Sequence, residues 1–139
     1  MTVAPDLVEP FRAWRVWRVR DGRLRSAFSP YAEWEPGRPL RAVCNPAQRR
    51  LDDEHAAPDE RCSCGVWGLK RRDPHRGVAL YEFGLNPNLL VIGRHIVGRV
   101  ALWGNVVEYE HGWRAQYAYP LALPDAGLAR LYGCEVLLG

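Results

Sequence analysis

VGRVALWGNVVEYEHGWRAQYAYP, residues 97–120, is the stretch that decides the fold. Its second half is rich in β-branched and aromatic residues, which favour strands, and the tripeptide Glu110-His111-Gly112 divides it. A three-residue loop with Gly112 in the left-handed region predicts a β-hairpin between residues 106–110 and 113–119. A two-residue turn at His111-Gly112 would mix apolar and charged side chains on both faces, so we prefer the longer loop.

The register of this hairpin places Tyr109 opposite Trp113 and separates two faces. One face is mainly apolar, and the other carries the polar side chains of Glu108, Arg114 and Gln116. A sheet that is buried on one side requires this alternation. Together with the other strand-like segments, the hairpin predicts a mainly β (β-rich α+β) fold. The specific expectation is a small, partly open β-barrel of SH3-like or PUA-like type.

The other expected elements follow from the same patterns. Asp21-Gly22 is a type I′ turn signal that predicts a second hairpin between residues 13–20 and 23–28. Leu128 and the acidic Asp125 predict a C-terminal helix within residues 124–132, with Gly133 as its C-cap. Glycines in the strand regions predict bends or bulges at Gly93, Gly98 and Gly104. Further strands are expected at 40–43, 65–69, 78–85, 89–92, 96–103 and 134–138, and either a short helix or a surface loop at 47–53.

The length of 139 residues predicts one domain, here residues 11–139, after a flexible N-terminal arm at residues 1–10 that contains Pro5 and Pro10. No apolar run is long enough for a membrane span, and the N-terminus lacks a signal-peptide pattern. We therefore expect a cytoplasmic protein without a membrane partner. Its four cysteines should then be reduced, metal-bound or catalytic.

Three of these cysteines and one histidine form a candidate metal site of Cys44, His55, Cys62 and Cys64. Cys₃His is a legitimate structural zinc set, although a C-x-C pair is less common in zinc sites than C-x₂-C. The ligands lie in a proline-rich and polar region that has little apolar content to order it. We expect a zinc ion to hold this loop-rich insertion in place, with Gly65 giving the backbone freedom to turn.

Other roles for the same residues stay open. The cysteines are also typical of small buried apolar side chains, and Cys134 is expected in the core. Cys44 could pair with Cys62 or Cys64 in a disulfide, which the expected compartment disfavours. Cys64 could act as a nucleophile with His55 or His75 as its base. His75 could also replace His55 as the fourth metal ligand.

Basic residues gather in two places, although the net charge of +3 is too small to indicate a nucleic-acid-binding protein by itself. Lys70 is the only lysine among 19 basic residues, a bias that a GC-rich genome explains. One face of the first hairpin carries four arginines, which form either a solvated edge or an anion site. The candidate anion-binding residues are Arg18, Arg20, Arg23 and Arg25 in this hairpin and Lys70, Arg71 and Arg72 in a later loop.

Two segments, HAAPDERCSCGVW at 55–67 and GRVALWGNVVEYEHGWRAQYAYP at 98–120, carry a resemblance. Together the chain resembles a family of small uncharacterised proteins of GC-rich bacteria. Those proteins share an A-P-x-x-x-C-x-C-G segment and a W-G-x-V-x₅-G-x-R-A segment. The resemblance implies a discrete single-domain unit and attaches no activity to it.

Three functions fit these observations. The first is a non-enzymatic binding module with structural zinc and an anionic ligand, nucleic acid being the best candidate, with exposed tryptophans stacking on bases. The second is a small-molecule-binding protein or a cysteine-dependent enzyme, with an aromatic pocket in which Arg114 anchors an acidic group. The third is an accessory subunit that binds another protein through a sheet edge. The expected pocket residues are Trp34, Trp67, Trp103 and Arg114.

Overall fold

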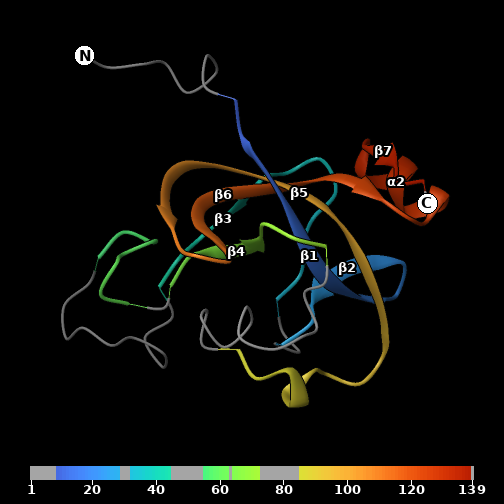
Figure 1. Cartoon of the computed structure of the whole chain (residues 1–139). Coiled ribbons are helices and arrows are strands. Elements are labelled where there is room, and N and C mark those ends of the chain that lie inside the picture. The colour runs from blue at the N-terminus through green and yellow to red at the C-terminus, as the bar shows by residue number, and fades with distance from the viewer. Residues whose placement is uncertain (1–8, 29–31, 45–54, 63, 73–84, 139) are drawn as a thin grey trace.

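A computed structural model describes residues 9–28, 32–44, 55–62, 64–72 and 85–138. Within these ranges one sheet of seven strands curls into an incomplete ring (Figure 1). A short 3₁₀ helix precedes the longest strand, and one α-helix lies near the C-terminus. The elements are β1 (Phe11–Arg20), β2 (Arg23–Ser26), β3 (Leu40–Arg41), β4 (Val66–Leu69), η3 (Pro87–Leu89), β5 (Arg94–Glu108), β6 (Gly112–Leu123), α2 (Ala126–Tyr132) and β7 (Glu135–Val136).

The pairing of the strands explains why the ring stays incomplete. β1 pairs with β2 and β5, and β6 pairs with β5, β4 and β3, all antiparallel, while β7 joins β6 in parallel. The link between β1 and β4 consists of one residue pair, Trp14 with Leu69. The predicted mainly β fold with a partly open ring and one C-terminal helix is therefore confirmed. Figure 1 shows α2 and β7 side by side at one end of the sheet.

The first hairpin has the register that its turn predicts. Trp17 pairs with Ser26, and Val19 pairs with Leu24. The turn residues Asp21 and Gly22 have φ angles of 53° and 71°, as a type I′ turn requires. Because the turn chemistry is local, two residues were enough to fix which side chains share a face.

The register predicted for the second hairpin is wrong by one residue. Glu108, not Tyr109, lies opposite Trp113, and Val107 lies opposite Arg114. The backbone N–H of Tyr109 donates to the carbonyl of Gly112 at 2.8 Å, so the connection is a two-residue turn, and Gly112 is not left-handed. The predicted register assumed that the charged side chain of Arg114 faces solvent. In the structure this side chain is buried and donates a hydrogen bond to the carbonyl of Cys62 in another segment.

One continuous strand, β5, replaces the interrupted strands expected in this region. It bends at register shifts between Arg99 and Val100 and between Trp103 and Val106. The second shift contains Gly104, whose φ of +81° confirms the predicted bulge. The strand expected at 89–92 is wrong, because the side chain of Asn86 accepts a hydrogen bond from the N–H of Asn88 and caps a turn of 3₁₀ helix.

The C-terminal helix α2 has the predicted caps. Asp125 accepts a hydrogen bond from the N–H of Leu128 at 3.0 Å, and Gly133 is left-handed. The strand that follows it is shorter than the expected 134–138. The segments 47–53 and 78–84, for which a helix or loop and a strand were expected, lie outside the described residues, as do residues 1–8 of the expected arm.

Two clusters of buried side chains lie on opposite faces of the sheet. The larger contains Trp17 and Trp34, whose rings meet edge to face with centroids 5.4 Å apart. The smaller contains Trp67 with Val16 and Leu69. The Arg15 guanidinium lies 5.0 Å from the ring centre of Trp34 and 4.3 Å from that of Trp67, and donates to the Trp67 carbonyl at 2.7 Å. Burial lowers the pKa of Arg15 to about 9.

Candidate metal centre

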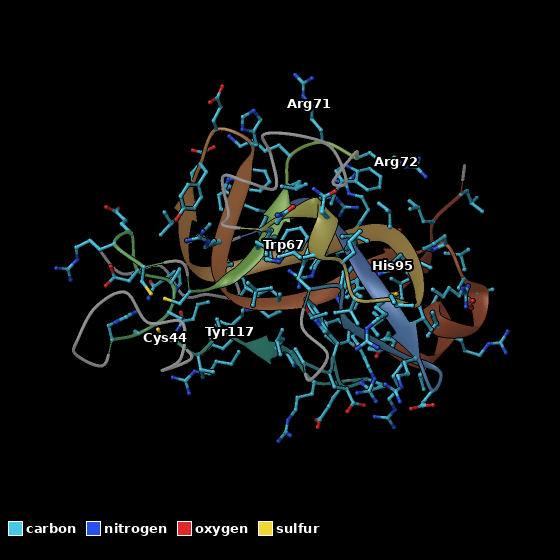
Figure 2. All side chains as sticks on the ribbon, turned by 90° about the horizontal axis from the view of Figure 1, so that it is seen from below. Cys44, Trp67, Arg71, Arg72, His95 and Tyr117 are labelled. Carbon is cyan, nitrogen blue, oxygen red and sulfur yellow. The ribbon has the colours of Figure 1, made fainter. Side chains whose placement is uncertain are left out.

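The four predicted metal ligands come together at one edge of the sheet. One ligand atom from each of Cys44, His55, Cys62 and Cys64 lies within 4.8 Å of all the others. The Sγ atoms of Cys44 and Cys62 are 3.7 Å apart, and the Sγ of Cys64 is 3.4 Å from the Nε2 of His55. Figure 2 shows yellow sulfur atoms gathered beside Cys44, well apart from Trp67.

These distances match the edges of a zinc tetrahedron. Zinc binds sulfur at about 2.3 Å and imidazole nitrogen at about 2.0 Å, which separates two sulfur ligands by about 3.8 Å and a sulfur from a nitrogen by about 3.5 Å. The two short separations in this cluster agree with both values. The chemistry of the donor set also fits zinc, because three thiolates and one imidazole select a borderline-soft ion over calcium or magnesium.

Backbone hydrogen bonds hold the segments that carry Cys44 and Cys62. Cys44 follows β3, where the N–H of Ala42 donates to the carbonyl of Gln116 in β6 at 2.8 Å. Cys62 lies in a tight turn, because its N–H donates to the carbonyl of Asp59 at 3.0 Å. The Asp59 carboxylate accepts from the N–H of Arg61 at 2.9 Å, and this bond lowers the pKa of Asp59.

Gly65 allows the chain to pass from the ligand turn into β4. Its φ is +114°, and a Cβ there would lie 2.9 Å from the Cβ of Pro58 and 3.1 Å from the Cβ of Arg114. Only glycine combines this conformation with so close an approach. The backbone freedom predicted for Gly65 is therefore used where Cys64 joins the sheet.

Arg114 braces the ligand turn from the sheet. Its side chain is buried, and its guanidinium donates to the carbonyl of Cys62 at 2.9 Å and to the hydroxyl of Tyr109 at 3.2 Å. The guanidinium also lies 5.0 Å from the centre of the Tyr109 ring. A zinc ion with three thiolates and a neutral imidazole carries a net charge of −1, so a buried cation beside it is favourable.

Without a bound metal ion, the thiol of Cys64 is protonated at neutral pH. Burial first, and then the neighbouring thiols of Cys62 and Cys44, raise the pKa of Cys64 to about 11, although hydrogen bonding with the Asp59 backbone opposes this. A thiol with so high a pKa lacks the activation that a nucleophile needs. All four cysteines are free of disulfides. Cys134 packs against the larger core cluster, as expected, and His75 lies outside the described residues.

A cavity of about 240 Å³ opens beside the cluster. Cys44 and His55 contribute to its wall. None of the four residues expected to form an aromatic pocket borders it, because Trp34 and Trp67 are buried in separate clusters and Trp103 stacks on Tyr117 with centroids 5.9 Å apart. The cavity is lined by Arg41, Ala42, Val43, Cys44, His55, Ala56, Ala57 and Gln116.

The arginine face of the first hairpin is partly buried and partly neutralised. Arg18 is only 3% exposed. The carboxylate of Glu33 lies 3.5 Å from the guanidinium of Arg23 and 3.9 Å from that of Arg25. Arg20 lies 3.8 Å from Asp21, a pair in which both side chains are well exposed. The sequence missed Glu33 because its isolated bridge to Arg25 joins the hairpin to a proline-rich segment without strand patterning.

The second predicted basic group, Lys70 to Arg72, lies at the end of β4 (Figure 2). Lys70 forms a 2.8 Å ion pair with Glu108, while Arg71 and Arg72 are exposed. The guanidinium of Arg72 lies over the ring of Trp14, 5.2 Å from its centre. The structure therefore connects this group to β1 and β5, a juxtaposition that spacing along the chain does not indicate.

Comparison of the chain with protein-family models, curated proteins and solved structures gave no match. The resemblance to small proteins of GC-rich bacteria and the SH3-like or PUA-like type stay predictions. Among the described residues, no helix is both long enough and apolar enough to cross a membrane.

Proposed function

We propose that this chain is a non-enzymatic, cytoplasmic binding module in which one structural zinc ion fastens the 44–64 segment to the sheet, and that its ligand is anionic, with nucleic acid as the best candidate. The observation that carries the zinc assignment is the convergence of three thiols and one imidazole within 4.8 Å. Four protein ligands complete a tetrahedron, which is typical of structural zinc, whereas catalytic zinc keeps a position open for water.

Zinc would act here as a substitute for core packing. In the described part of these ligand segments, few apolar side chains are buried, Ala57 and Cys62 among them. Metal coordination supplies folding free energy directly in such small loop-rich regions. The hydrogen bond from Arg114 to the carbonyl of Cys62 and the backbone conformation of Gly65 hold the ligand turn against the sheet. The ion would therefore complete a site that the sheet already organises.

The test is elemental analysis of the full chain purified without chelator. We expect about one zinc per chain, and less than about half an equivalent would overturn the assignment. Cys62→Ser should lose the metal, whereas Cys134→Ser, which changes the one cysteine outside the cluster, should keep it. Retention of zinc by both variants would contradict the assigned ligand set.

Thiol labelling separates this proposal from a cysteine-dependent enzyme. In zinc-loaded protein, Cys64 should react slowly with a maleimide reagent and become reactive only after a strong chelator removes the metal. Rapid labelling of Cys64 in metal-loaded protein would favour a reactive thiol instead.

A further inference from the structure

Two cations on β1 and β5 lack a carboxylate partner among the described residues, and they lie away from the tip of the first hairpin. Arg12 and Arg99 form no ion pair in the described part of the chain. The side chain of Arg99 donates instead to the backbone carbonyl of Arg12 at 3.0 Å. Burial and then the like charge of Arg12 lower the pKa of Arg99, so the two cations repel each other.

An aromatic side chain lies within this cationic group. Trp14 pairs with Arg99, and Arg12 pairs with Ala101, so the register places Arg12, Trp14 and Arg99 on one face of the sheet. The guanidinium of Arg99 lies 4.6 Å from the centre of the Trp14 ring, and that of Arg72 lies 5.2 Å from it. Cation–π contacts hold these guanidinium groups in place, which lowers the entropy cost of binding an anion.

Two of the other candidate anion-binding cations differ in their surroundings. Lys70 lies 2.8 Å from Glu108, and Arg23 lies 3.5 Å from Glu33. An incoming phosphate would have to compete with a carboxylate at those residues, whereas at Arg12 and Arg99 it would relieve repulsion.

We propose that the surface formed by Arg12, Trp14, Arg72 and Arg99 binds single-stranded nucleic acid. Phosphates contact Arg12 and Arg99, and an unpaired base stacks on the Arg72–Trp14 pair. Figure 2 shows Arg72 near Arg71 at the rim of the molecule. Alternating guanidinium and aromatic groups suit single strands, because a duplex hides the base faces that stack. This inference rests on the proposed anionic ligand and names its class and its site.

The test measures fluorescence anisotropy of labelled 12-nucleotide single-stranded DNA and RNA with the full zinc-loaded chain over a range of salt concentrations. The double variant Arg12→Ala/Arg99→Ala should weaken binding by about tenfold or more. The slope of log affinity against log salt concentration should become shallower by about one to two, which corresponds to the loss of one to two phosphate contacts. The matched control, Arg20→Ala/Arg23→Ala, removes the same charge from the hairpin face and should weaken binding by less than about threefold. Thermal unfolding verifies that each variant is folded.

A second variant keeps the proposal testable if the loss of Arg99 prevents folding. The side chain of Arg12 is exposed, and Arg12→Ala alone should reduce the salt slope by about one. Three outcomes would overturn the assignment. The first is an equal loss of affinity in the Arg12→Ala/Arg99→Ala and Arg20→Ala/Arg23→Ala variants. The others are stronger binding of a duplex or of polyglutamate than of single strands, and no oligonucleotide binding by the zinc-loaded protein. A loss of oligonucleotide affinity in Arg20→Ala/Arg23→Ala alone would also overturn this site, because it would assign the anion to the hairpin face, but the proposed anionic ligand would stand. The absence of zinc from the purified chain would overturn only the metal assignment.

Discussion

Replacing Arg114 by methionine should weaken zinc binding without removing a zinc ligand. Arg114 is 5% exposed, and its 2.9 Å hydrogen bond to the carbonyl of Cys62 connects the sheet to the ligand turn. Hydrogen bonds from charged donors contribute about 1.5–3 kcal/mol, and methionine would leave the Cys62 carbonyl without this donor. Because about 1.4 kcal/mol is a factor of ten, the zinc affinity should fall by about 10–100-fold.

The assay is competition for zinc between the chain and a chromophoric chelator at pH 7, together with thermal unfolding with and without metal. Arg114→Lys keeps the charge but cannot reproduce the planar fork, so its affinity should lie between those of the wild type and Arg114→Met. Arg99→Met is the matched control, because Arg99 also donates to a backbone carbonyl, at 3.0 Å, but away from the cluster. A zinc affinity of Arg114→Met within about twofold of wild type would refute the bracing role.

Three further predictions concern the scaffold. Tyr132→Phe removes the hydroxyl that donates to the carbonyl of Trp34 and accepts from the N–H of Leu24. The free energy of unfolding in urea should therefore fall by about 2–4 kcal/mol. An equal fall for Tyr119→Phe, whose side chain is less buried, would contradict this reasoning. Gly68→Ala would place a Cβ atom 2.6 Å from the Cβ of Ala13, so the free energy of unfolding should fall by about 1–3 kcal/mol in the same measurement. An unchanged free energy of unfolding would show that β4 can shift to make room. The N–H of Leu128 and then Arg94 lower the pKa of Asp125, so its contribution is present at pH 7 and is lost as the pH falls through that lowered pKa. The difference in melting temperature between wild type and Asp125→Ala should therefore close in acid, and a constant difference would contradict the cap.

The two hairpins show how far local patterns reach. The first is fixed by Asp21-Gly22, because a type I′ turn constrains both neighbouring strands within a few residues. The second lacks such a turn, so its register follows from contacts across the sheet. The N–H of Lys70 donates to the carbonyl of His111 at 2.9 Å, and Arg114 finds its acceptor on the ligand turn. A pattern of apolar and charged residues cannot anticipate a buried guanidinium whose partners come from another segment.

The composition of the metal cluster was predictable for a chemical reason. Few residue types bind zinc, and three cysteines with one histidine, in a segment poor in apolar residues, form a legitimate structural zinc set. Their convergence was not determined by spacing. It depends on β3 and β4 both pairing with β6, which brings Cys44 and Cys64 to the same edge of the sheet.

By itself, the sequence determined the mainly β class, the first hairpin, the helix caps and the residue types of the metal set, because these depend on turn chemistry, side-chain alternation and ligand chemistry within short segments. Only the tertiary structure decided which charges are buried, paired or left uncompensated. Arg18 and Arg114 are buried, and Arg23 lies beside Glu33. Arg99 in β5 donates to the backbone carbonyl of Arg12 in β1. Electrostatic surroundings depend on distances between segments far apart in the chain, which strand pairing sets and local patterns do not encode.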